Sequence, residues 1–375
     1  MSDYLPFARP TIDEQSIADV AQVLRSGWIA SGPYVEKFES ALSTYLGGRR
    51  VRTVTSGTAA LEIALRAAGV REGDGVIVPA MSFVASANVV MRVGAIPVFV
   101  DVELHTRNLD LALVPAAIHR GVRAIMPVHF AGLPVNPERL YDIAAEHGLR
   151  VIEDAAHAIG STYRGRRIGS FGDIACFSFH PNKNMTTIEG GAIAFGSGVD
   201  ERFVEAERFH GIVRDADGNV DGVRAGGKYN LSDVSARLGL AQLERLDAFT
   251  ARRRELANMY FDELGADPPG VLPERGDSGH CWNMFTLLLP FDQLGLTRAQ
   301  FQHAMAERGI GVGVHYPCIP SLSAYQNLSR RTDHRYPNAT RIGRETVTLP
   351  LFPTMVDSDV RRVCDAMRAV LAHRP

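Results

Sequence analysis

The segment FSFHPNKNMTTIEGG at residues 177–191 sets the interpretation of the whole chain. Its first residues complete an apolar run at 174–179, which indicates a strand buried in a core. Lys183 follows four residues beyond Phe179, between two asparagines. Most lysines lie on solvated surfaces, where the charged amine stays in water. A lysine just past a core strand is therefore either a surface loop residue or an amine kept for chemistry.

Apolar, β-branched runs alternate with helix-like stretches on the N-terminal side of this segment. Helices are expected at residues 60–69 and 137–148, where Gly69 and Gly148 are typical C-terminal caps. Because the strand-like runs are apolar on both faces, they predict a mostly parallel sheet covered by helices, an α/β fold. Ligands bind such sheets beyond the carboxyl ends of the strands, where Lys183 lies. The expected strands are 76–80, 97–102, 124–130, 150–154, 174–179 and 191–195.

The sequence becomes mainly helical from about residue 200 onward, with a long amphipathic stretch at 231–260. The last third combines a strand-like run at 285–290 with further helices. A chain of 375 residues exceeds one typical core, so two domains are expected. We predict a large domain at residues 1–248, including an N-terminal arm, and a smaller C-terminal α+β domain at residues 249–375.

The composition excludes several classes of function. With 46% hydrophobic residues, 22% charged residues and a net charge of −2, the composition gives no electrostatic sign of nucleic-acid binding, which needs a strongly basic face. No apolar run approaches the length of a membrane helix, and MSDYLPFARP has no features of a signal peptide. We therefore expect a cytoplasmic protein without membrane insertion. No zinc site, other metal site or disulfide framework is predicted, because the four cysteines are far apart: Cys176, Cys281, Cys318 and Cys364.

The stretch TSGTAALEIAL at residues 55–65 is a candidate phosphate site. A strand-like run leads into Ser56, Gly57 and Thr58, and a helix begins at once. Helix N-termini offer unpaired N–H groups and partial positive charge, glycine permits close approach of the backbone, and the two hydroxyls add donors. The alternative is that Ser56 or Thr58 simply caps the helix.

A second candidate lies in VIEDAAHAIG at residues 151–160. Asp154 ends a buried strand, where an unpaired carboxylate is costly, so it needs a cationic or hydrogen-bonded partner. His157 follows three residues later and can face the same cleft. Either Asp154 keeps a heteroaromatic nitrogen protonated, or it caps a helix that is followed by a structural histidine.

A phosphate site, a buried carboxylate and a strand-end lysine together suit pyridoxal phosphate. This cofactor needs an anion site for its phosphate, an acidic partner for its ring nitrogen and an amine for its aldehyde. An amine with a lowered pKa can also carry the α-proton of an amino acid. Pyridoxal 5'-phosphate is therefore the predicted cofactor.

The sequence resembles the DegT/DnrJ/StrS family of pyridoxal-phosphate-dependent nucleotide-sugar aminotransferases over essentially its whole length. The resemblance implies a fold-type-I architecture, with a large domain around a seven-stranded sheet and a smaller C-terminal domain. It also implies a homodimer with shared active sites. The matching stretches are GWIASGPYVEKFE (27–39), TSGTAAL, PAMSFVASAN (79–88), IEDAAHAIG, FSFHPNKNMTTIEGGAI, KYNLSDVSARLGLAQLERL (228–246) and LPLFP (349–353).

The resemblance also implies roles for individual residues. Lys183 would bind the cofactor covalently and then move the proton, and Asp154 would pair with the pyridine nitrogen. His157 would lie near the ring hydroxyl, and Phe83 would stack on the ring or simply pack in the core. Some relatives replace the lysine with histidine and dehydrate instead, a branch that Lys183 disfavours. The phosphate would be held by Ser56, Gly57, Thr58 and Ser178, and by Asn230 of the neighbouring subunit.

The sugar pocket is less typical of the family. LPFARP, RFHGI and KYNLSD look like the UDP-4-amino-4-deoxy-L-arabinose aminotransferase branch of lipid A modification. However, Pro320 replaces a histidine that the family often has, and HCWNMF at 280–285 also differs from the common pattern. Tyr316 is a candidate substrate-binding residue, whereas His180 and His315 contact sugar hydroxyls, contact the donor carboxylate or simply pack.

The predicted reaction is the transfer of an amino group from L-glutamate to a nucleotide-activated keto sugar, with a 4-keto sugar preferred. The products would be 2-oxoglutarate and an amino sugar for lipopolysaccharide, another surface glycan or a secondary metabolite. One alternative is other pyridoxal-phosphate chemistry, such as amination of a cyclic ketone or an aromatising synthase. Another is a non-catalytic sensor or scaffold, against which Lys183, Asp154 and the phosphate site argue.

Overall fold

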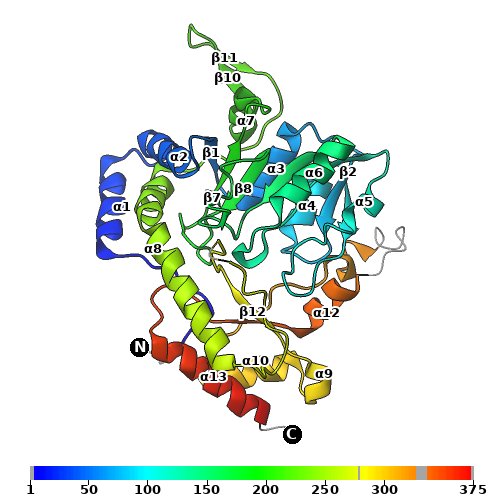
Figure 1. Cartoon of the computed structure of the whole chain (residues 1–375). Coiled ribbons are helices and arrows are strands. Elements are labelled where there is room, and N and C mark those ends of the chain that lie inside the picture. Colours follow the sequence, from blue (N-terminus) through cyan, green and yellow to red (C-terminus); the bar gives the residue numbers. More distant parts are fainter. Residues whose placement is uncertain (1–3, 278, 327–335, 373–375) are drawn as a thin grey trace.

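A seven-stranded sheet lies at the centre of the molecule (Figure 1), in the order β1-β9-β8-β5-β4-β2-β3. The computed structural model describes residues 4–277, 279–326 and 336–372. β9 is antiparallel to both of its neighbours, and all other neighbouring strands are parallel. The expected α/β fold with a mostly parallel sheet is thus confirmed. The strands are β1 (Arg50–Val54), β2 (Gly75–Pro79), β3 (Ile96–Val100), β4 (Val122–Ile125), β5 (Arg150–Asp154), β8 (Ile174–Ser178) and β9 (Gly191–Phe195).

Helices cover both faces of this sheet because its strands alternate between two apolar layers. In β2, Val76 and Val78 pack with α3 (Gly57–Ala67) and α4 (Ala85–Arg92), whereas Ile77 packs with α6 (Pro137–His147). The remaining helices of the N-terminal two thirds are α1 (Glu14–Ser26), α2 (Pro33–Tyr45), α5 (Val114–Ala117), α7 (Glu201–Arg208) and α8 (Asp233–Leu264).

The helix ends follow the sequence signals closely. Gly148 caps α6 in the left-handed conformation, as expected, and its backbone N–H bonds the carbonyls of the last turn. Gly69 is also left-handed, but it follows Ala68, which is the cap of α3. Gly148 thus ends α6 as expected, whereas Gly69 lies one residue beyond the cap of α3.

One expected strand is shorter than the sequence suggested. The apolar run at 124–130 continues beyond β4, which ends at Ile125. Pro127 has no N–H to continue the ladder of hydrogen bonds, although its carbonyl accepts one from Asp154 N at 2.9 Å. The chain then turns in a short 3-10 helix, η1 (Phe130–Gly132), in which Ala131 has a φ of 53°.

The last third of the chain forms a second apolar cluster at the foot of the molecule (Figure 1). It surrounds the antiparallel pair β12 (Phe285–Leu288) and β13 (Thr346–Leu349) and includes Leu5 from the N-terminal arm. α8 packs against α1 and α2 at one end and against α13 at the other. It therefore connects the helices beside the central sheet to this second cluster. The helices of the last third are α9 (Phe291–Leu294), α10 (Arg298–Glu307), α12 (Pro337–Glu345) and α13 (Asp357–Ala372), with the 3-10 helix η2 (Ile319–Ser321). The buried residues of α12 and η2 pack with the core of the central sheet.

The predicted domain boundary between residues 248 and 249 falls inside α8, which is continuous across it. The boundary therefore stays a prediction about which residues move together. Two short hairpins complete the described structure: β6 (Thr162–Tyr163) with β7 (Arg166–Arg167), and β10 (Ile212–Arg214) with β11 (Val220–Gly222). The β10–β11 hairpin projects from the top of the molecule in Figure 1.

Within the residues that the structure describes, none of the helices has the length and apolar character that crossing a membrane requires. In the same ranges, His, Cys, Asp and Glu side chains nowhere gather in a group of three or more that could hold a metal ion.

Candidate active site

A cavity of about 310 Å³ lies at the carboxyl edge of the central sheet. Asp154 is the last residue of β5, and Lys183 lies on the turn that follows the neighbouring strand β8. The structure brings together all but one of the residues that the sequence nominated; Asn230 alone does not line the cavity. Those that line it are Ser56, Gly57, Thr58, Phe83, Asp154, His157, Ser178, His180, Lys183, His315 and Tyr316.

Lys183 is half-buried on its turn, and its backbone N–H donates to the carbonyl of His180 at 2.8 Å. Desolvation by the surrounding protein lowers the pKa of its amine to about 8, although the charge of Asp154 acts in the opposite direction. At pH 7, about one pH unit below this pKa, about a tenth of the amine is uncharged, far more than for an ordinary lysine. An uncharged amine can act as a nucleophile or accept a proton.

Asp154 is only 5% exposed, and each of its carboxylate oxygens has a donor. Ser86 Oγ donates to Oδ2 at 2.8 Å, and the N–H of Ala156 donates to Oδ1 at 3.1 Å. Burial nevertheless raises the pKa of this carboxyl above its usual value, and the nearby Lys183 charge only partly offsets that effect. A further cation in the cavity would stabilise the ionised carboxylate.

His157 is a neutral histidine whose tautomer is set by the backbone. The N–H of Ala131 donates to His157 Nδ1 at 3.3 Å, so the ring proton is on Nε2. Burial also lowers the pKa of His157 well below its usual value. Nε2 lies 3.3 Å from the hydroxyl of Tyr316, and the two rings are nearly parallel, at 19°. The hydroxyl of Tyr316 accepts this proton, which leaves its own O–H to donate to another acceptor.

The N-terminus of α3 forms the other side of the cavity. Ser56 caps the helix, as its Oγ accepts from the N–H of Ala59 at 3.0 Å, and the first intrahelical bond is made by Ala60. The N–H groups of Gly57 and Thr58 come before that bond and are available to an anion. A side chain at Gly57 would lie 2.8 Å from Cβ of Ser178, so only glycine lets the helix start approach β8 so closely.

The substrate-side candidates differ from one another in exposure and in hydrogen-bond partners. The His180 side chain is 49% exposed, with Nδ1 2.8 Å from Oδ1 of Asn182 and Nε2 3.9 Å from Glu189. His315 is buried, and its Nδ1 lies 2.7 Å from Oγ1 of Thr348. Burial lowers the pKa of His315 to about 4, so it is a neutral hydrogen-bonding group at physiological pH.

The sequence model of the DegT/DnrJ/EryC1/StrS aminotransferase family matches residues 10–368. The chain belongs to this family. The match spans the central sheet, the cavity and most of the C-terminal cluster, so the resemblance inferred from the sequence motifs is confirmed, as are the fold type and the aminotransferase class.

Several solved structures share the whole fold of this DegT/DnrJ/EryC1/StrS aminotransferase. Spr1654 from Streptococcus pneumoniae, assigned as a sugar aminotransferase, is 31% identical, with a TM-score of 0.91 over 99% of this chain and 100% of its own. PseC from Helicobacter pylori, an aminotransferase of pseudaminic acid biosynthesis, is 25% identical, with a TM-score of 0.91 over 99% and 100%. DesV from S. venezuelae is 32% identical, with a TM-score of 0.89 over 99% of both chains.

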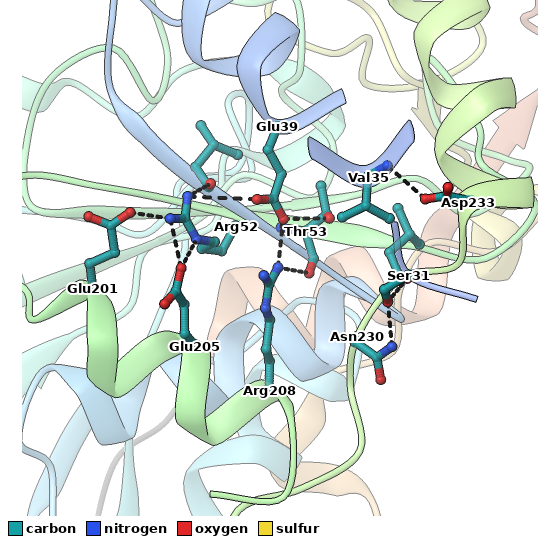
Figure 2. Close-up of polar contacts among 12 residues, drawn as sticks. Ser31, Val35, Glu39, Arg52, Thr53, Glu201, Glu205, Arg208, Asn230 and Asp233 are labelled. Atoms are coloured by element: carbon teal, nitrogen blue, oxygen red, sulfur yellow. Dashed lines mark hydrogen bonds and ion pairs between the residues drawn. The ribbon is translucent and has the colours of Figure 1, made fainter. Parts of the chain in front are cut away.

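Asn230 lies outside the cavity of its own chain, on a segment that pairs with β1 through Val54 (Figure 2). Its Nδ2 donates to the hydroxyl of Ser31, and its Oδ1 accepts from Lys228. Nearby, Asp233 caps the N-terminus of α2, because its carboxylate accepts from the N–H of Val35 at 2.9 Å. In this aminotransferase, then, Asn230 cannot contact the cavity of its own chain in the described arrangement.

A charge network fixes the same region of the aminotransferase (Figure 2). Arg52 of β1 lies between Glu39 of α2 and two carboxylates of α7, those of Glu201 and Glu205. Arg208, at the end of α7, donates to Glu39 at 2.6 Å and to the carbonyl of Thr53. The network ties α7 to β1 and α2 and thereby sets where the chain leaves for the β10–β11 hairpin.

Sequence reasoning missed several residues of the site. Ser86, the donor to Asp154, lies in the first turn of α4, and no local motif in the sequence links it to a carboxylate 68 positions away. Asn182 and Glu189, which flank the lysine turn, line the cavity as well. Both residues belong to the segment at 177–191, but only the folded turn shows that they face the cavity.

Proposed function

We propose that this aminotransferase transfers an amino group from L-glutamate to a nucleotide-activated keto sugar, with the acceptor carbonyl at position 4. The products are 2-oxoglutarate and an amino sugar for lipopolysaccharide, another surface glycan or a secondary metabolite. The observation that carries the proposal is a lysine amine of lowered pKa that shares one cavity with a buried carboxylate and a helix N-terminus. The relative Spr1654, whose name assigns it as a sugar aminotransferase, supports the acceptor class.

Pyridoxal phosphate as the cofactor is confirmed, since Spr1654 was solved in PLP and PMP forms within this family. The residues of the cavity also fit this group. Lys183 would hold the aldehyde carbon, Asp154 the ring nitrogen, and Gly57 and Thr58 the phosphate. Phe83 is 53% exposed on the cavity wall, which is unusual for a phenylalanine and leaves its ring free to pack on a bound aromatic. When bound, the protonated cofactor ring draws electrons from the carbon of the amino acid that loses its proton.

Each residue then has a defined task. Asp154 keeps its negative charge opposite the ring nitrogen, and Ser86 and Ala156 hold its carboxylate in one orientation. Lys183, once its amine is free, accepts the proton from the donor amino acid and returns it to the adjacent reacting carbon. Because its pKa is about 8, the amine can both accept and release this proton near neutral pH.

The cavity would bind the two substrates in turn. The His180 side chain is half exposed and has polar ring nitrogens, so we assign it to a carboxylate of glutamate or to a sugar hydroxyl. His315, which is neutral, and Tyr316, which is a donor, suit sugar hydroxyls. The finer proposal of a UDP-linked 4-keto pentose in lipid A modification, made in the cytoplasm, rests on LPFARP, RFHGI and KYNLSD in the sequence.

We further propose a homodimer in which Asn230 of each chain completes the phosphate site of the other. The support is that Asn230 lies outside its own cavity while its segment is held firmly by β1 and α7. An amide with a fixed backbone and a partly exposed side chain is suited to contact a neighbouring subunit. A two-fold axis would then give two equivalent shared sites.

The proposed function can be tested with purified protein, L-glutamate and a panel of UDP-, dTDP- and GDP-linked keto sugars. We expect one class of sugar to be aminated, identified by product mass, with an equal amount of 2-oxoglutarate. A Lys183→Ala variant is the matched control and should give neither product. A product that has lost water instead would indicate an aromatising or dehydrating enzyme. No turnover of any sugar, without 2-oxoglutarate, would contradict the proposal.

A further inference from the structure

Asn283 does not line the cavity, yet it contacts the turn that carries Lys183. It is 4% exposed and lies two residues before β12, in the C-terminal part of the chain. Buried amides are usually hydrogen-bonded, because an unpaired one costs the free energy of losing its water. The positions of its bonds therefore indicate what Asn283 holds in place.

One side-chain amide of Asn283 binds both residues that flank Lys183. Its Nδ2 donates to the backbone carbonyl of Asn182 at 3.1 Å and to Oδ1 of Asn184 at 3.1 Å. Because Nδ2 carries two protons, both bonds can form at once. The backbone of Asn182, before the lysine, and the side chain of Asn184, after it, are thus both bonded to the same amide nitrogen of Asn283.

Asn184 extends this contact into the core. It is 3% exposed, and its own Nδ2 lies within 3.4 Å of the carbonyls of Ile159 and Cys281. The two asparagines therefore form a chain of amide hydrogen bonds away from solvent. Such bonds are stronger in a low-dielectric interior, and breaking one leaves a buried polar group without a partner.

Asn283 is itself held by the backbone on either side. Its N–H donates to the carbonyl of Ala131 at 2.8 Å, and its own carbonyl accepts from the buried guanidinium of Arg253 at 3.3 Å. Ala131 has the unusual φ of 53°, and its N–H donates to His157. Asn283 therefore connects the lysine turn to the turn that sets the tautomer of His157.

We propose that Asn283 is a positioning residue for Lys183, which it holds with its amine in the cavity by fixing both neighbours of the lysine. The inference rests on the proposed function, in which that amine reacts with the cofactor. A lysine side chain has four rotatable bonds, so placing its amine requires at least a fixed backbone. If the turn loosens, the amine can reach water, and its pKa rises toward the ordinary value for lysine.

The test measures capture of pyridoxal phosphate by the full-length chain after the cofactor has been removed. Capture is followed at a series of pH values, fixed with borohydride and located by peptide mass. The variant is Asn283→Leu, which keeps the volume and removes both donors. Asn184→Leu, which removes one of the two acceptors, is the second variant. The matched control is Asn338→Leu, whose lost bond, from Nδ2 to the carbonyl of Val102 at 2.8 Å, lies on α12 outside the cavity.

We expect the pH midpoint of capture at Lys183 to rise by roughly one unit in Asn283→Leu and by less in Asn184→Leu. The kcat should fall by about tenfold to a hundredfold, with KM for glutamate changed by less than about twofold. The control should keep the wild-type midpoint. These pH midpoints are the readout that loss of folding stability alone would not move.

Three outcomes would overturn a claim, and they are distinguishable. If wild-type protein is not labelled at Lys183, the proposed function fails. If wild type is labelled but both asparagine variants keep its midpoint and kcat, the positioning role of Asn283 is wrong. An equal shift in Asn338→Leu would assign the effect to general loosening of the fold and would also overturn the inference. Should Asn283→Leu not fold, the comparison between Asn184→Leu and the control decides.

Discussion

The floor of the cavity and its mouth differ in solvent exposure and in hydrogen bonding. At the floor, formed by Asp154 and His157, each residue is at most 5% exposed, and its polar atoms bond within the same chain. At the mouth, formed by Phe83, His180 and Glu189, side chains are about half exposed or more. The floor is therefore complete before any ligand binds, whereas the mouth acquires its contacts from substrate or from a second subunit.

This contrast separates the reaction from its specificity. A preorganised floor lowers the barrier because its dipoles and charges need no rearrangement during the reaction. An exposed mouth gains contacts only when its ligand arrives, so its residues select the substrate. Substitutions at the floor should lower kcat, whereas those at the mouth should change KM and the choice of sugar.

The largest expected effect is at the lysine. Lys183→Ala removes both the cofactor link and the proton carrier, so we expect activity to fall on the order of 10⁴-fold or more. The protein should fold normally, because a half-buried lysine beyond a strand contributes little to the core. Thermal unfolding and the ultraviolet–visible spectrum check both points. Activity within about tenfold of wild type would remove Lys183 from the chemistry.

The next effect concerns the charge at the floor. Asp154→Asn keeps the shape of the side chain but removes the negative charge opposite the ring nitrogen. We expect kcat to fall on the order of a hundredfold or more, while cofactor affinity, set largely by α3, changes less. Steady-state kinetics and a cofactor titration separate the two. Near-normal turnover would show that Asp154 is only structural.

A smaller effect is expected where the mouth meets the second subunit. Asn230→Ala should lose about 1.5–3 kcal/mol of phosphate-site interaction. If Asn230 serves the neighbouring cavity, a heterodimer of Asn230→Ala and Lys183→Ala carries one site with both defects and one with neither. Mixing and re-associating the two variants should then restore up to about half of the wild-type activity per heterodimer. Confirmed heterodimers with only the mean activity of the parents would place Asn230 in its own subunit's function.

The smallest effect is a shift in a pH midpoint. Only the uncharged amine of Lys183 attacks the cofactor, so capture should increase with pH and level off above about 8. The charge of Asp154 raises the pKa of Lys183, so Asp154→Asn should lower that pKa and move the midpoint to lower pH. Borohydride trapping across pH measures it. A midpoint that moves to higher pH in Asp154→Asn would show that the two groups are not coupled as described.

The sequence predicted the floor better than the mouth, for physical reasons. Buried strands have a clear apolar signature in the sequence. A polar residue at or just beyond the end of such a strand costs free energy unless it is paired or functional, so Asp154 and Lys183 could be identified. Pro127, which ends β4 early, can be read from the sequence. The expected strand at 124–130 was nevertheless based on the apolar residues around it and did not take account of the missing N–H.

The residues that sequence reasoning missed act through contacts between distant segments. Ser86 lies 68 positions from Asp154, and Asn283 lies about a hundred positions from the lysine turn that it holds. No periodicity or local motif records such pairings, because they depend on which strand ends the fold brings together. The roles of residues at the mouth are even harder to predict from the sequence, because they depend on ligands and on a second chain.

The central claim is that this floor, within this chain, performs the amino transfer. The most direct measurement is the half-reaction of purified, cofactor-loaded protein with L-glutamate alone, followed by rapid quench and quantification of 2-oxoglutarate. The account predicts about one equivalent of 2-oxoglutarate per active site with no acceptor sugar present, since the amino group is held until the sugar arrives. It predicts none from Lys183→Ala and slow formation from Asp154→Asn. Wild-type protein that holds its cofactor at Lys183 yet forms no 2-oxoglutarate from glutamate would contradict the account.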